Sequence, residues 1–140
     1  MGLFDIFKKK YTSEKSPEKT LTPETLKFNK MWDMWADGQI ESPFQDLMTY
    51  QSEVNNGGHS QFFFNLDNTD DVNAIVKETL SILPEVHKRN LEEAYSAYKK
   101  YNEVDDDKME EIFDNCDDVF YENEELINEV LEKYAEAIEL

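Results

Sequence analysis

Cysteine is nearly absent from this chain of 140 residues, which holds one thiol, at Cys116. A disulfide within the chain is therefore excluded, and a reducing compartment is the expected setting, so the sequence predicts a cytoplasmic protein. Histidine is also scarce, with only His59 and His87. No spacing among these three residues matches a zinc site or a nucleophile with its base. We therefore expect no metal, no cofactor and no catalytic residue, and we interpret the chain as a non-enzyme.

Long hydrophobic runs are missing as well. The apolar stretch near the start, Leu3 to Phe7, leads into three Lys and is too short for a signal peptide or a membrane span. The chain then stays polar as far as Thr20, with Ser, Thr, Glu, Lys and Pro, which is typical of a linker. We interpret residues 1–20 as a flexible arm without stable membrane association, and residues 21–140 as one folded domain.

Basic residues are few, because 14 Lys and Arg face 32 Asp and Glu, for a net charge of −18. Residues 1–30 hold seven Lys and four acids, so residues 31–140 carry a net charge of −21. Such a field repels nucleic acid and attracts basic protein surfaces, which argues against direct nucleic-acid binding and for a basic protein partner. The aromatic content of 13% indicates a folded core rather than disorder. We expect that core to include Trp32, Trp35, Phe62 and Phe63.

Strand signals are lacking, because no pair of alternating segments flanks a hairpin turn. Start and stop signals instead bracket segments with a 3.6-residue apolar period, which predicts an all-α, compact domain of about six helices. Two amphipathic helices in the last 40 residues are expected to be antiparallel neighbours. The first helix is predicted to begin after the cap Thr22 and to stop at Gly38, and a Ser42–Gln45 capping box should begin the second. A turn or kink is expected at 55–58, before an aromatic helix that ends near Asn65. The next helix should be capped by Thr69 or Asp70, and Pro84 should separate it from the helix that follows.

The last 40 residues concentrate the negative charge, with sixteen acids and two Lys for a net charge of −14. As a helical pair they would span roughly 30 Å, over which duplex DNA carries roughly 18 charges. Such a surface is either a solvated face or a binding site for proteins that bind nucleic acid. Eight carboxylates recur every three or four residues opposite the apolar positions of the two helices: Asp107, Glu110, Asp114, Asp118, Glu125, Glu129, Glu132 and Glu136.

One polar segment in the middle of the chain has a more specific pattern. It reads Glu-x-Asn-Asn-Gly-Gly-x-x-Gln-Phe-Phe-x-Asn, and its polar and glycine positions include Glu53, Asn56, Gly57, Gly58, Gln61 and Asn65. Considered alone, these residues are suited to a helix junction: glycine supplies a positive φ, and amides satisfy free backbone groups. We therefore interpret them as structural and place the binding function in the carboxylates.

This segment resembles the signature of a bacterial family whose described representative is the neisserial DNA-mimic protein. The later stretch from Phe113 to Tyr134, with Asp117, Phe120 and Tyr121, is similar to the same family's pattern. The resemblance implies an all-helical domain, with a homodimer as one option, whose acidic surface occupies the DNA-binding site of a transcription factor. The alternative is an acidic inhibitor or immunity-type protein that neutralises a toxin, because such proteins use the same electrostatic attraction.

Overall fold

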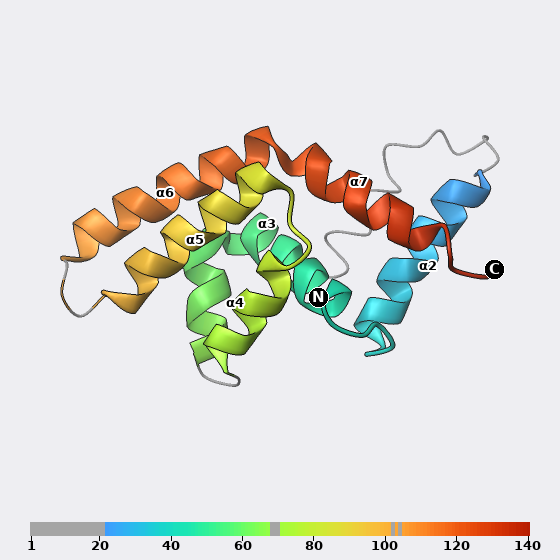
Figure 1. Cartoon of the computed structure of the whole chain (residues 1–140), viewed down its shortest axis with the longest axis horizontal. Helices are drawn as coiled ribbons and strands as arrows, with labels where there is room; N and C mark the ends of the chain where they lie inside the picture. The colour runs from blue at the N-terminus through green and yellow to red at the C-terminus, as the bar shows by residue number, and fades with distance from the viewer. Residues whose placement is uncertain (1–21, 68–70, 102, 104) are drawn as a thin grey trace.

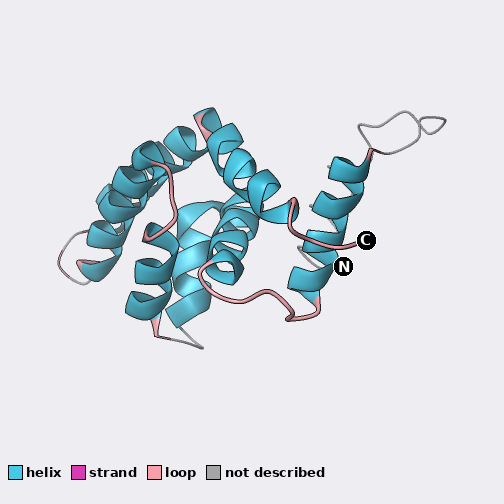
Figure 2. Cartoon of the chain, turned by 45° about the vertical axis from the view of Figure 1, so that its right-hand side comes forward, coloured by secondary structure: helices cyan, strands magenta, loops and turns pink. Residues whose placement is uncertain are grey.

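The computed structural model describes residues 22–67, 71–101, 103 and 105–140. All regular structure among these residues is helical, with no strand, which confirms the all-α prediction (Figures 1 and 2). The predicted arm at residues 1–20 lies outside the described residues. The six helices are α2 (Pro23–Ala36), α3 (Phe44–Asp67), α4 (Val72–Leu80), α5 (Glu85–Lys99), α6 (Asp106–Glu122) and α7 (Glu124–Ala135).

Helices α6 and α7 follow one another as a long band across the top of Figure 1. Helix α5 packs under α6, α2 packs against α7, and α3 contacts α4, α5 and α6. The expected antiparallel pairing of α6 with α7 is therefore wrong. Asn123 alone separates the two helices, whereas a reversal of direction between helices needs a loop of about two to five residues.

Side-chain N-caps begin three of the helices, α2, α4 and α6. The sequence predicts the first of these caps correctly. The Thr22 hydroxyl accepts a bond from the Thr25 amide at 3.1 Å, as expected. The Ser42–Gln45 capping box is wrong, because the Ser42 hydroxyl instead donates to Asp46 at 2.6 Å. Helix α4 is capped by Asp71, one residue beyond the two predicted candidates, which lie outside the described residues.

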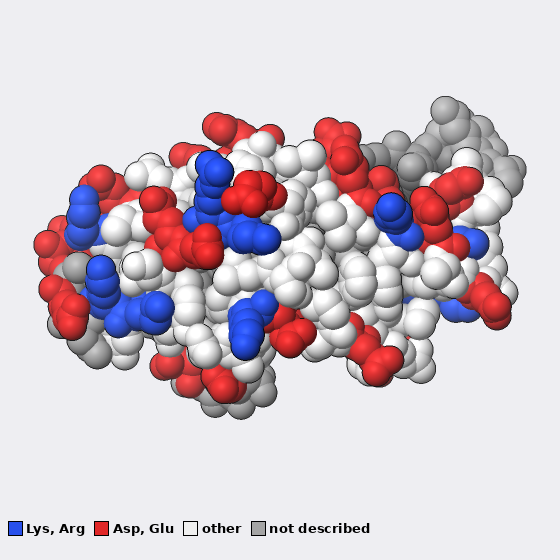
Figure 3. Space-filling model, viewed as in Figure 1, with Lys and Arg blue, Asp and Glu red and all other residues white. Residues whose placement is uncertain are grey.

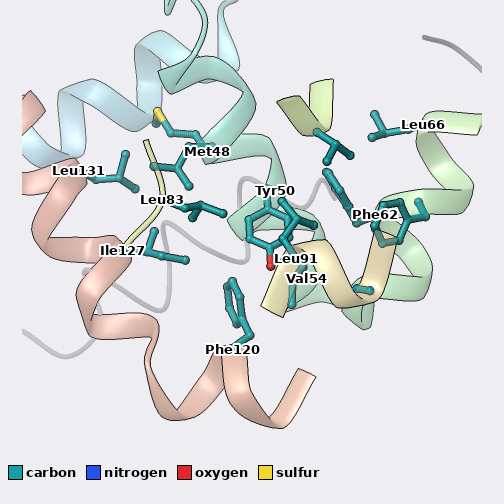
Figure 4. Close-up of a cluster of buried hydrophobic side chains, with 14 of the residues drawn as sticks. Met48, Tyr50, Val54, Phe62, Leu66, Leu83, Leu91, Phe120, Ile127 and Leu131 are labelled. Carbon is teal, nitrogen blue, oxygen red and sulfur yellow. The ribbon is translucent and has the colours of Figure 1, made fainter. Parts of the chain in front are cut away.

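The core is one cluster of buried apolar side chains contributed by all six helices. Figure 4 shows its middle, where Tyr50 and Phe62 of α3 meet Leu91 of α5 and Phe120 of α6. The prediction that Trp32, Phe62 and Phe63 are buried is confirmed, and Trp35 is half-buried against the same cluster. The helices are thus held by packing of their apolar faces, which leaves their outer faces available for other contacts.

Among the described residues, no helix combines the length and the apolar character that a membrane span requires.

Candidate functional site

Helix α3 changes direction at two glycines. Gly57 has φ −156° and ψ 21°, and Gly58 has φ 76° and ψ −175°. The predicted kink and the predicted positive φ are therefore confirmed at Gly58, whose backbone conformation is essentially restricted to glycine. The kink divides α3 into a first half that ends at the glycines and a second half that carries the aromatic residues Phe62 and Phe63.

Side chains from α6 form hydrogen bonds with backbone groups on both sides of the kink. Here the Tyr121 hydroxyl donates to the Val54 carbonyl at 2.7 Å, and the His59 amide donates to Asp117 Oδ1 at 2.8 Å. Helix α6 therefore contacts the kink through Asp117 and Tyr121.

The polar residues of the signature form a second set of contacts across the same kink. Glu53, before the glycines, accepts hydrogen bonds from Gln61 at 2.9 Å and from Asn65 at 2.7 Å, both after them. Asn56 donates to the Gln61 side-chain oxygen at 2.9 Å. The structure thus brings Glu53, Asn56, Gln61 and Asn65 together as a brace between the two halves of α3. Their amide and carboxylate groups are therefore bonded to one another at the surface of the kink.

His59 is the centre of a buried polar chain. Its Nδ1 donates to Asp117 at 2.7 Å, and the Tyr50 hydroxyl lies 2.7 Å from its Nε2. Tyr50 and His59 are both completely buried, and burial raises the pKa of Tyr50 well above the ordinary value. An Asp–His–hydroxyl arrangement resembles a catalytic triad, but a nucleophile must be able to reach a substrate. These three groups instead hold the kink against α6.

Cys116 and His87 are buried in the same region. Burial and the nearby Glu93 raise the pKa of the Cys116 thiol to about 12, so the reactive thiolate is suppressed. His87 donates from Nε2 to the Asn123 carbonyl at 2.7 Å, and burial lowers the pKa of its ring. No group of three His, Cys, Asp or Glu residues in the described part of the chain is arranged to hold a metal ion.

The eight predicted carboxylates are all exposed, on the outer faces of α6 and α7. We call this set the acidic ridge. Among the residues that the structure describes, none of these eight side chains forms an ion pair or a side-chain hydrogen bond. Other carboxylates of the same two helices, such as Asp117 and Glu124, accept hydrogen bonds from α3. The fold therefore divides the carboxylates into an internal set with partners and an external set without them.

The charge is denser on α6 than on α7. Helix α6 contains eight Asp or Glu and one Lys, a net charge of −7, along roughly 25 Å at ~1.5 Å per residue. One charge per ~3.6 Å is close to the ~3.4 Å of a single phosphate strand. Helix α7 has four Glu and one Lys over its 12 residues. Because α6 and α7 follow one another instead of lying side by side, the charge per unit length is that of one DNA strand. The duplex-like charge density that the sequence predicted is therefore wrong.

Basic residues lie beside the end of the ridge and away from its centre. Lys27 of α2 donates to the Glu136 carbonyl at 3.0 Å, and Lys30 donates to the Glu139 carbonyl, so two cations stand at the carboxyl end of α7. Figure 3 shows Asp and Glu side chains along the upper edge, over α6 and α7, and Lys and Arg mixed with acids on the face below. The α6 part of the ridge is thus more negative than the α7 part.

Two residues that position the site, Asp117 and Tyr121, were not singled out as functional from the sequence. Both lie 58 or more residues from the groups they bind. The resemblance of the stretch from Phe113 to Tyr134 included both residues without giving them a role. Their spacing of four residues on α6, next to the buried positions Phe113, Cys116 and Phe120, is a second signal that could have identified them.

Comparison with protein families matches residues 43–138 to the family described as DMP19-like protein. The matched segment runs from the start of α3 through α7, so it contains the kink and the acidic ridge. No curated protein and no solved structure matches the chain. The chain belongs to the DMP19-like protein family, a family of DNA mimics.

Proposed function

We propose that this chain is a DNA mimic whose acidic ridge occupies the nucleic-acid-binding surface of a transcription factor or another DNA-binding protein. The observation that carries the proposal is the separation of the carboxylates. Eight are exposed and unpaired on the outer faces of α6 and α7, while the carboxylates that hold the fold point inward. Membership of the DMP19-like family supports the same function.

The energetics of the helices favour a binding role over a purely structural one. Like charges three or four residues apart destabilise a helix by roughly 0.2–0.5 kcal/mol per pair. Asp107, Glu110, Asp114 and Asp118 form three such pairs on α6, and none of the four gains an internal partner. A basic partner surface would relieve this repulsion, because each carboxylate would then face a Lys or Arg.

A reversal of the α6 carboxylates tests the proposal. The variant Asp107→Lys, Glu110→Lys, Asp114→Lys and Asp118→Lys should lose its DNA-binding partner in a low-salt pull-down from the source cell. Its helical circular dichroism should persist, because the four side chains are exposed. A matched control reverses four exposed acids elsewhere, Asp37, Glu41, Glu78 and Glu92, and changes the total charge by the same amount.

Two further measurements separate DNA mimicry from other acidic binding. DNA should compete with the protein for the partner, and the affinity should fall steeply as ionic strength rises, because both surfaces are screened. Recovery of a toxin whose binding is indifferent to DNA would instead support an inhibitor or immunity-type protein. Equal loss of the partner in the ridge variant and the control variant would show that total charge, and not the ridge, controls binding.

A further inference from the structure

Tyr121 is an aromatic residue that the fold leaves exposed. Its side chain is 47% exposed near the end of α6, and among the described residues Tyr101 is the one other large aromatic side chain that is exposed. The members of the α6 part of the acidic ridge lie three or four residues apart, and Tyr121 continues this row three residues after Asp118. The exposed ring therefore stands on the same face of α6 as Glu110 and Asp114.

Two contacts hold the ring of Tyr121 in place. The Tyr121 hydroxyl donates to the Val54 carbonyl at 2.7 Å, and the ring meets Phe120 edge-on, with the two ring centres 5.4 Å apart. Burial, together with the carboxylates of Asp117 and Glu124, raises the pKa of Tyr121, so the hydroxyl stays protonated and remains a donor. The ring is thus presented to solvent in one orientation. A group that is already oriented loses less conformational entropy when a partner binds.

We propose that Tyr121 is the aromatic anchor of the partner interface, and that its exposed ring packs against an arginine side chain of the partner's DNA-binding surface. The proposal rests on the function proposed above and names a residue through which the interface selects its partner. The charge of the neighbouring ridge attracts a basic surface. Arginine is the cation best suited to an aromatic face, because its guanidinium is planar and weakly hydrated. Tyrosine is also among the residues that contribute most to the affinity of protein–protein interfaces.

A contact through the ring differs from the contacts of the ridge in its response to salt. The exposed carboxylates attract a partner through a field that salt screens. The ring makes a short-range contact instead, to which the burial of apolar surface and dispersion contribute. We therefore expect the ridge to control affinity at low ionic strength, and Tyr121 to supply a part of the affinity that persists at high ionic strength.

Paired substitutions of Tyr121 in the full chain separate the role of its ring from that of its hydroxyl. Tyr121→Phe and Tyr121→Leu both lose the hydrogen bond to the Val54 carbonyl, but only the second loses the aromatic face. The probe is a fluorescein-labelled peptide of alternating Arg and Gly, with the Lys-Gly peptide as reference, and fluorescence anisotropy gives Kd at low and high salt. Tyr121→Phe should bind the arginine peptide as tightly as the unsubstituted chain does. Tyr121→Leu should bind it about two- to fivefold more weakly at both salt concentrations.

The matched control is Tyr101→Leu, which removes the other exposed tyrosine ring at a position outside the ridge and should leave the peptide affinity unchanged. Equal affinities of Tyr121→Phe and Tyr121→Leu, or an equal loss in Tyr101→Leu, would overturn the proposal, as would an equally large difference with the lysine peptide. Release of a DNA-binding partner by the ridge reversal, with the two Tyr121 variants binding alike, would leave DNA mimicry standing and remove the anchor. A difference between the two Tyr121 variants without any partner that DNA displaces would have the opposite meaning.

Discussion

Replacement of Gly58 by alanine should destabilise the protein more than a positive φ alone accounts for. The backbone at this residue has φ 76° and ψ −175°, and a non-glycine residue in such a region costs about 1–3 kcal/mol. The new Cβ would also lie 2.4 Å from Asp117 Oδ2, so the carboxylate must move. Its movement weakens two hydrogen bonds to the buried His59, and an unsatisfied buried donor costs about 1–3 kcal/mol.

Together these effects should lower the free energy of unfolding by about 3–5 kcal/mol, or the midpoint temperature by about 10–15 °C for a chain of this size. Gly38 provides the matched control, because its φ is 74° and nothing lies within 4 Å of an added Cβ. Gly38→Ala should therefore show the φ penalty alone, about 1 kcal/mol. Urea unfolding followed by circular dichroism measures both variants on the same scale.

A double-variant cycle with Asp117→Ala isolates the steric part of the effect. In that background the carboxylate is gone, so the additional cost of Gly58→Ala should fall to its backbone penalty of about 1–3 kcal/mol. Equal destabilisation by Gly58→Ala and Gly38→Ala in the otherwise unchanged chain would refute the reasoning, because it would show that Asp117 yields without cost.

Three further outcomes are expected from the same region. Tyr121→Phe should reduce the free energy of unfolding by about 1 kcal/mol, because the Val54 carbonyl loses its donor, and urea unfolding measures this loss. Cys116 should resist iodoacetamide at pH 8 in the folded protein and react in urea, since its thiol has a pKa of about 12 and is buried; rapid alkylation of the folded protein would contradict this. Burial lowers the pKa of His87 in the folded protein from the ordinary value of 6.5. Below pH 6.5 the unfolded chain therefore binds more protons than the folded protein, so the free energy of unfolding should decrease as the pH falls. His87→Gln should make unfolding free energies measured at pH 7 and 5.5 differ less than in the unsubstituted protein.

Helix ends and buried faces could be predicted from the sequence because their causes are local. Thr22, Gly38 and Pro84 act within one helical turn, and an apolar period of 3.6 residues decides which side of a helix turns inward. The kink at Gly57 and Gly58 was predictable for the same reason, since only glycine adopts the backbone conformation that such a turn requires.

The partner of each helix could not be predicted in this way. Periodicity shows that α6 and α7 each have a buried face, but it does not say that α5 covers one and α2 the other. The roles of Asp117 and Tyr121 were missed because their hydrogen bonds join positions 58 and 67 residues apart. On the helical pattern alone, Asp117 is one more acid beside the ridge, and only the fold distinguishes it from Asp114 and Asp118.

The division between inward and outward carboxylates makes the surface of this protein exchangeable. Asp117 and Glu124 specify how α3 meets α6 and α7, and Glu53 joins the two halves of α3, so a change at any of them alters the scaffold itself. The side chains of the acidic ridge form no such contacts, so these residues can be substituted while the same six helices form. A library that varies only the outer positions would present new charge patterns on a constant backbone, and selection from it could redirect the protein from one basic partner to another.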